Sequence, residues 1–195
     1  MNNTTSPLTI LDHIIDVAGS LFYREGTKSV GVDRIILEAG VAKATMYRYF
    51  SGKDALVAAC LQRRHDKVMA ALQAGLSATR ATGHAKVLRV FELLHAKAES
   101  PDFRGCAFML AVAENEGSEE VRAIARMHKQ TVQALFAELL PPAWPQAQQI
   151  AAQLNLLYDG AMAQILIFRK PDAALVAKEC AATLLRAAEQ KPARA

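Results

Sequence analysis

Apolar residues recur along most of this chain at intervals of three and four positions, which is the spacing of one face of an α-helix. Ile10, Ile14 and Leu21 show this pattern before Gly26 interrupts it. Eight more segments of this kind follow, separated by short stretches with glycine, proline or polar residues: 31–40, 42–50, 54–72, 85–99, 105–116, 118–140, 146–170 and 172–190. The pattern predicts an all-α protein of about nine helices, and the alanine- and leucine-rich composition agrees with it.

Several residues have the chemistry of helix ends. Thr9, with Asp12 three residues later, is a suitable N-cap for the first helix, and Ser6 before Pro7 is the alternative. Gly26 and Gly40 follow the first two predicted helices, at the position where a left-handed backbone is common.

The chain changes character near residue 75, where a glycine and the polar stretch "SATRATGH" separate two groups of helices. We therefore predict an N-terminal three-helix domain over residues 1–54 and a linking helix over 53–74. A larger helical domain is predicted over residues 75–195. A chain of 195 residues is long enough to bury a sizeable core.

Residues 39–56 read "AGVAKATMYRYFSGKDAL" and combine a glycine-containing turn with the start of a short helix. Two short helices joined by such a turn form a helix-turn-helix. Positions three and four apart share a helix face, so Met46 and Phe50 are expected to point inward. The outward positions are Lys43, Ala44, Thr45, Tyr47 and Arg48. Small residues followed by hydrogen-bond donors suit the major groove of duplex DNA, and Lys53 opens the next helix, where a phosphate is favoured.

Charge supports this interpretation only locally, because the formal net charge is a mild +4. Residues 24–53 hold six lysines and arginines against three acids, which is suggestive of a polyanionic partner. Two alternatives stay open. Tyr47, Tyr49 and Phe50 could pack a small core beneath solvated cations, or the helix-turn-helix could serve packing alone in a dimerisation or scaffold protein.

The segment "TILDHIIDVAGSLFYREGTKSVGVDRIILEAGVAKATMYRYFSGKDALVAACL" resembles, almost position by position, the DNA-binding domain of the TetR family of bacterial transcriptional regulators. The resemblance implies that Tyr47 and Lys53 contact phosphates. It also implies that Lys43, Ala44, Thr45 and Arg48 face the groove, with some of them reading bases. The sequence departs from the family pattern at Ala42 and Gly31, where many members have capping hydroxyls.

The two predicted helices nearest the C-terminus have more apolar surface than one neighbour would cover. In the resembled family the last two long helices pair with those of a second copy. The resemblance therefore implies a homodimer, which also suits a palindromic operator in double-stranded DNA. The predicted dimer residues are Leu157, Ala161, Ile165, Phe168 and Leu184. The alternative is that these apolar faces close the core of a monomer.

Polar residues within apolar patterns, and a segment near residue 106, mark a possible ligand pocket. The candidates are His95, Cys106, Phe108, Met109, His128, Asn155, Tyr158, Asp159 and Met162. We expect an unknown small-molecule effector that is mostly apolar, because the patterned interior offers few charges. The expected function is a dimeric repressor that this effector releases from its operator. The alternative is a thiol-based redox sensor that uses Cys106, next to a helix N-terminus and after Arg104.

Other functional classes lack their sequence signals. The chain shows no Ser/His/Asp order, HExxH, P-loop or dinucleotide fingerprint, so we expect no enzymatic activity. Three widely spaced cysteines fit neither a disulfide framework nor a metal site, and no cofactor is expected. The N-terminus lacks the features of a signal peptide, and no apolar run is long enough to suggest a membrane span. The expected location is the cytoplasm.

Overall fold

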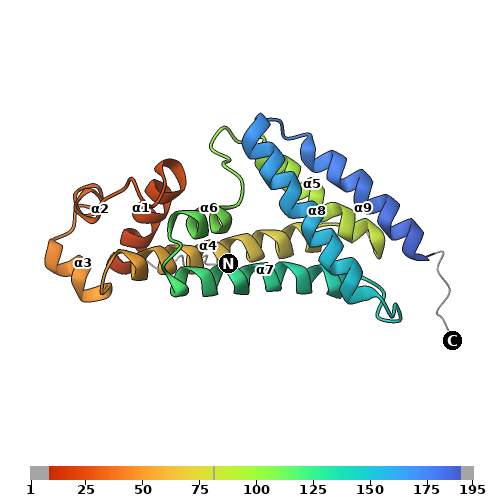
Figure 1. The fold of residues 1–195 in the computed structure, drawn as a ribbon, viewed down its shortest axis with the longest axis horizontal. Helices are drawn as coiled ribbons and strands as arrows, with labels where there is room; N and C mark the ends of the chain where they lie inside the picture. The colour runs from red at the N-terminus through yellow and green to blue at the C-terminus, as the bar shows by residue number, and fades with distance from the viewer. Residues whose placement is uncertain (1–8, 81, 190–195) are drawn as a thin grey trace, which may run out of the picture. The chain divides into compact units, whose positions relative to one another are not determined.

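The computed structural model describes residues 9–80 and 82–189, and this part of the chain is all-helical. This described part contains nine helices, whose arrangement is drawn in Figure 1. They are α1 (Ile10–Glu25), α2 (Val32–Ala39), α3 (Lys43–Tyr49), α4 (Lys53–Ser77), α5 (His84–Ala98), α6 (Ala107–Glu114), α7 (Glu119–Leu139), α8 (Ala147–Phe168) and α9 (Ala173–Glu189). The predicted fold class is confirmed, and every predicted helix lies within a few residues of its expected place.

The helix ends follow local chemistry. The side chain of Thr9 accepts a hydrogen bond from the backbone N–H of Asp12, whose carboxylate accepts one from the backbone N–H of Thr9. This reciprocal capping box confirms Thr9 as the N-cap, whereas Ser6 lies outside the described residues. Gly26 and Gly40 end α1 and α2 at φ angles of 90° and 62°, which L side chains rarely adopt.

The helices form two compact units. The first contains the described residues up to Asp66 together with Ala107–Ala125. The second contains Lys67–Cys106 and the described residues from Arg126 onward. Helices α4 and α7 each contribute residues to both units.

Aliphatic side chains from α1 to α4 form the core of the first unit. Ile14, Ile35, Met46 and Leu56 are almost completely buried there. Arg63 of α4 forms ion pairs with Asp12 and Asp16, and these pairs tie α4 to α1. Apolar burial of this kind is the main source of stability for a small helical unit.

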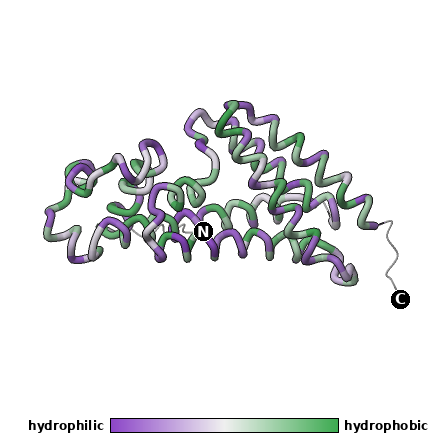
Figure 2. The backbone as a smooth tube through the Cα atoms, viewed as in Figure 1, coloured by the Kyte–Doolittle hydropathy of each residue, from purple (hydrophilic) through white to green (hydrophobic). Residues whose placement is uncertain are grey.

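Helices α5, α8 and α9 pack against one another in the second unit (Figure 1). An aromatic cluster lies inside this unit, where the rings of Phe91, Phe136 and Tyr158 have centroids 5.8–6.1 Å apart. Figure 2 shows hydrophobic positions recurring along the whole length of α8. By length and composition, α8 is the single described helix apolar enough to cross a membrane, a test that core helices of soluble proteins also pass.

Candidate nucleic-acid interface

Helices α2 and α3 form the helix-turn-helix that the sequence predicts. Gly40 adopts a left-handed conformation at the end of α2, and its N–H donates to carbonyl oxygens of that helix. The chain then turns and enters α3 after Ala42. Met46 and Phe50 are buried, at 1% and 6% exposure, and they anchor the inner face of α3. Anchoring of this face leaves the opposite face of the helix outward.

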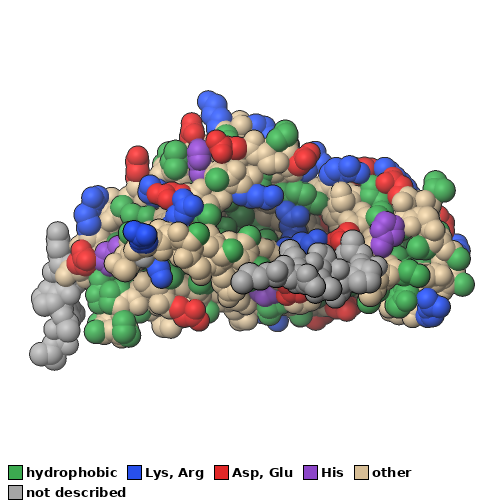
Figure 3. Space-filling view, turned by 180° about the vertical axis from the view of Figure 1, so that it is seen from behind, with side chains coloured by type: hydrophobic (Ala, Val, Ile, Leu, Met, Phe, Trp, Pro, Cys, Tyr) green, Lys and Arg blue, Asp and Glu red, His purple; other side chains and the backbone are tan. Residues whose placement is uncertain are grey.

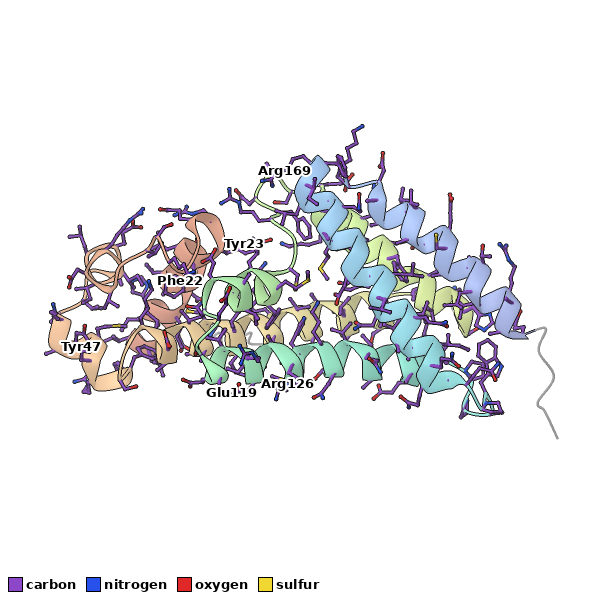
Figure 4. All side chains as sticks on the ribbon, in the orientation of Figure 1. Phe22, Tyr23, Tyr47, Glu119, Arg126 and Arg169 are labelled. Atoms are coloured by element: carbon purple, nitrogen blue, oxygen red, sulfur yellow. The ribbon has the colours of Figure 1, made fainter. Side chains whose placement is uncertain are left out.

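The outward face of α3 is open to solvent. Lys43, Ala44, Tyr47 and Arg48 are exposed and Thr45 is half-buried. Figure 4 shows Tyr47 projecting from α3. Of the three aromatic residues that could have packed a core, only Phe50 is buried, while Tyr47 and Tyr49 are 49% and 40% exposed. The packing alternative therefore explains Phe50 but does not explain the exposed rings of Tyr47 and Tyr49.

Two cations on this face have intramolecular partners. The ammonium group of Lys43 donates to the carboxylate of Asp33 at 3.0 Å, and this hydrogen bond raises the pKa of Lys43. The guanidinium group of Arg48 lies 4.9 Å from the centroid of the Tyr49 ring and donates to its hydroxyl at 3.3 Å. Both side chains are charged and held near the surface, as recognition of phosphates or base edges requires.

Helix N-termini add unpaired N–H groups to this unit. Neither Gly31 nor Ala42 supplies a side-chain cap to α2 or α3, as expected from the two departures in the sequence. Lys53, the first residue of α4, is half-buried. A lysine at such a terminus adds its charge to the positive end of the helix dipole, and this combination suits a phosphate group.

Charge on the visible surface is mixed in sign. In the face drawn in Figure 3, lysine and arginine side chains lie beside aspartate and glutamate side chains rather than gathering into one positive field. This arrangement agrees with the net charge of +4. Recognition of DNA would therefore depend on a few placed residues more than on the overall charge.

Comparisons with known proteins agree with this geometry. The sequence profile of bacterial regulatory proteins of the tetR family matches residues 14–60. A TetR-family transcriptional regulator from Streptomyces coelicolor is 32% identical, with a TM-score of 0.85, and the match covers 95% of this chain and 92% of that one. This chain belongs to the TetR family. It is a DNA-binding transcriptional regulator of the helix-turn-helix type.

Two further relatives show where the similarity is concentrated. A proposed TetR transcriptional regulator from Streptomyces avermitilis is 28% identical, with a TM-score of 0.80, over 94% of this chain and 100% of that chain. An HTH-type transcriptional regulator from Mycobacterium tuberculosis is 40% identical over 52 residues, which are 27% of this chain. The matched segment spans about a quarter (26%) of that curated relative. The sequence similarity to this relative is therefore limited to a segment the length of the DNA-binding domain.

The predicted pocket residues are divided between the two units. Phe108, which is buried, and Met109, which is 45% exposed, belong to the first unit. The others belong to the second unit: His95, Cys106, His128, Asn155, Tyr158, Asp159 and Met162.

Within the second unit, two of these polar groups lie beside side chains that carry a formal charge. His95 lies 3.3 Å from the carboxylate of Asp172, and Asp159 pairs with Lys129. Burial raises the pKa of Tyr158 above its ordinary value, so its hydroxyl stays protonated. The side-chain oxygen of Asn155 is buried and has no hydrogen-bond partner among residues 9–80 and 82–189, which makes it a candidate for a bound donor. The assignment of all these residues to a pocket stays a prediction.

The predicted dimer residues differ in exposure. Ala161 and Ile165 are 3% and 2% exposed because they pack within their own chain, whereas Leu157 and Leu184 are half-buried. Phe168 is 62% exposed. The large apolar side chains that α8 and α9 leave exposed are Leu156, Ile167, Phe168 and Val176.

Sequence reasoning missed the role of Glu114 at the end of α6. Its carboxylate accepts hydrogen bonds from the backbone N–H and hydroxyl of Thr27 and from the backbone N–H of Lys28. Asn115 also donates to the hydroxyl of Thr27. These contacts join α6 to the loop between α1 and α2. Some 87 residues separate the partners, so no local pattern could reveal them.

Proposed function

We propose that this TetR regulator is a dimeric repressor that a small, mostly apolar effector releases from a palindromic operator. The observation that carries the proposal is the outward face of α3. The small residues Ala44 and Thr45 lie near the start of the helix, among the cations Lys43 and Arg48 and the hydroxyl of Tyr47. Thr45 is half-buried and the other four side chains are exposed. A face of this kind enters the major groove without steric conflict.

Each residue predicted to contact DNA has a distinct role in this proposal. Tyr47 and Lys53 contact phosphates and fix the position of the protein on the duplex. Lys43, Thr45 and Arg48 read base edges, and the small side chain of Ala44 allows close approach to the groove. Phosphate contacts set affinity and its dependence on salt, while base contacts set sequence preference.

The apolar surface of α8 and α9 supports a homodimer. Leu156, Ile167 and Phe168 of α8 are 71%, 67% and 62% exposed, and Val176 of α9 is 60% exposed. A Cβ atom added at Gly160 would meet no atom of a neighbouring described segment within 4 Å, so a second helix can approach closely there. Exposed apolar patches on a soluble chain commonly mark interfaces. A two-fold dimer requires two half-sites, and hence a palindromic operator.

The interior of the second unit supports an apolar effector. Aromatic and aliphatic side chains surround few charges, and the ionic groups of Asp159 and Lys129 neutralise each other. The effector would bind the two conformations of the dimer unequally and so lower operator affinity. A site of clustered arginines occupied by an anionic compound would contradict this part of the proposal.

Neither the redox alternative nor an enzymatic role gains support from the side chains. Cys106 is only 7% exposed, so an oxidant has little access to its sulfur. Burial raises the pKa of Cys60 to about 12, so that thiol stays protonated near neutral pH. Cys180 is exposed. Replacement of Cys106 by serine should leave peroxide-treated protein behaving like wild type. A DNA-bound role for the repressor places it in the cytoplasm.

The proposal is tested by selecting bound duplexes from a random DNA pool. We expect a palindromic winner whose log affinity falls linearly with log salt concentration. Enrichment of nothing above random DNA, with and without cell extract to supply an effector, would contradict the proposal. Loss of binding to the winner on adding candidate apolar compounds would then identify the effector.

A further inference from the structure

An ion pair connects the two helices of the helix-turn-helix. It joins Lys43, the first residue of α3, to Asp33 in the first turn of α2, with 3.0 Å between the ammonium nitrogen and the nearer carboxylate oxygen. The side chains are 64% and 83% exposed, so neither is buried by the fold. An exposed pair of this kind contributes little to stability.

Two other sets of ion pairs in the first unit connect helices to one another. Arg63 binds Asp12 and Asp16 and so connects α4 to α1. Arg34 of α2 binds Glu25 at the end of α1, and this contact fixes the first two helices. These arginines are 24% and 45% exposed, both less than Lys43 at 64%. Asp33 differs because its partner belongs to the face proposed to read DNA.

Asp33 changes what Lys43 can do at that face. A free lysine binds any phosphate, and each phosphate that it neutralises adds affinity that is independent of sequence. A lysine held by a carboxylate has a defined direction and a partly neutralised charge. The carboxylate of Asp33 also repels phosphates, and it lies in the first turn of α2, where an N-terminus without a side-chain cap would otherwise attract one.

We propose that Asp33 is a specificity-determining residue that acts by positioning Lys43. It directs the ammonium group toward a base edge of the operator and withholds it from the phosphates of other DNA. This inference rests on the proposed function, because it requires the outward face of α3 to enter the groove. It concerns discrimination between DNA sequences and is independent of dimerisation and of the effector.

The test compares the full-length wild type with Asp33→Asn, on the selected operator and on random duplex, over a range of salt concentrations. Asp33→Asn should bind random DNA more tightly, with a salt slope steeper by about one, because one further lysine contacts phosphate. The ratio of operator to random affinity should fall at least fivefold. Asp54→Asn is the matched control, since it removes an equal charge from the first turn of α4.

A second pair of variants separates positioning from a general effect of charge. In a Lys43→Ala background, Asp33→Asn should no longer change the affinity ratio, since the residue that it positions is absent. The inference is overturned if Asp33→Asn and Asp54→Asn change the ratio equally, or if the effect of Asp33→Asn persists without Lys43. Failure of the proposed function itself has a different signature, which is that no duplex is selected by the wild type.

Discussion

The two units of this regulator differ in where their polar side chains lie, at the surface in the first unit and in the interior in the second. In the first unit, the cations and hydroxyls of α3 are exposed, and aliphatic side chains fill the interior. In the second unit, polar groups such as His128, Asn155 and Tyr158 are buried, while α8 and α9 expose large apolar side chains. One unit is suited to a polar polyanion. The exposed apolar side chains of the other suit an apolar partner surface.

This difference indicates which substitutions should affect stability and which should affect binding alone. A buried side chain can be removed only at a cost in packing, whereas an exposed one is free to serve a partner. Two results would contradict this difference between the units. One is a substitution of a buried residue that does not change stability, and the other is a substitution on the outward face of α3 that unfolds the protein.

The largest expected effect is on the aromatic cluster of the second unit. Phe91 is fully buried and contacts Phe136 and Tyr158, so Phe91→Ala should lower the free energy of unfolding by about 3–5 kcal/mol. Urea denaturation followed by circular dichroism measures this change. Leu37→Ala is the control, since it removes an apolar side chain that is 80% exposed and should cost far less. Equal losses would show that the cluster is not the core of the unit.

The second effect concerns binding without stability. Arg48→Ala should weaken operator binding by about 1–3 kcal/mol, or roughly 5- to 150-fold, while leaving the melting temperature unchanged. Fluorescence anisotropy and thermal denaturation provide the two readouts. Arg64→Ala is a suitable control, because this arginine stacks on Tyr23 rather than lying on α3. Unchanged affinity for every DNA sequence would instead favour a helix-turn-helix that serves packing alone.

A smaller loss of stability is expected at Gly105. Its φ angle is 73°, and a Cβ atom there would lie 3.2 Å from the carbonyl oxygen of Met162 and from the Cβ of Leu166. Gly105→Ala should therefore cost about 1–2 kcal/mol in the free energy of unfolding. Gly117→Ala is the comparison, because Gly117 has no positive φ angle and a Cβ atom there would meet no neighbouring atom within 4 Å, so the change should be neutral or stabilising. The same urea titration decides between these outcomes.

The smallest effect is a dependence of stability on pH. Hydrogen bonds from Thr9 and then from Arg63 lower the pKa of Asp12 to about 2. The ordinary value is 3.8, so this carboxylate contributes stability above about pH 4 and loses the contribution as pH falls toward 2. Asp12→Asn should lower the urea midpoint at pH 7 and flatten its decline between pH 4 and 2. A decline as steep as that of wild type would assign acid sensitivity to other carboxylates.

The sequence was sufficient to predict features that depend on neighbouring residues. The spacing of Met46 and Phe50 predicted the inner face of α3, and Thr9 and Gly40 marked helix ends, because caps and periodicity act over a few residues. The contacts of Glu114 with Thr27, and the pair of Asp33 with Lys43, depend on how helices pack in space. No local pattern contains that information.

Helix α8 shows a further limit of periodicity. Its apolar residues lie around most of the helix, so the pattern cannot tell which face packs within the chain and which is left for a partner. Ala161 and Ile165 are buried in their own chain, whereas Leu156 and Ile167 are exposed. A dimer would therefore depend on the exposed pair more than on the buried one.

The central claim is that two copies of the outward α3 face read one palindromic operator. The most direct measurement is the mass and affinity of the complex with the selected duplex, compared with the same duplex after one half-site is scrambled. We predict two chains per intact duplex and at least a tenfold loss of affinity when a half-site is lost. One chain per duplex, or equal affinity for both duplexes, would contradict the account.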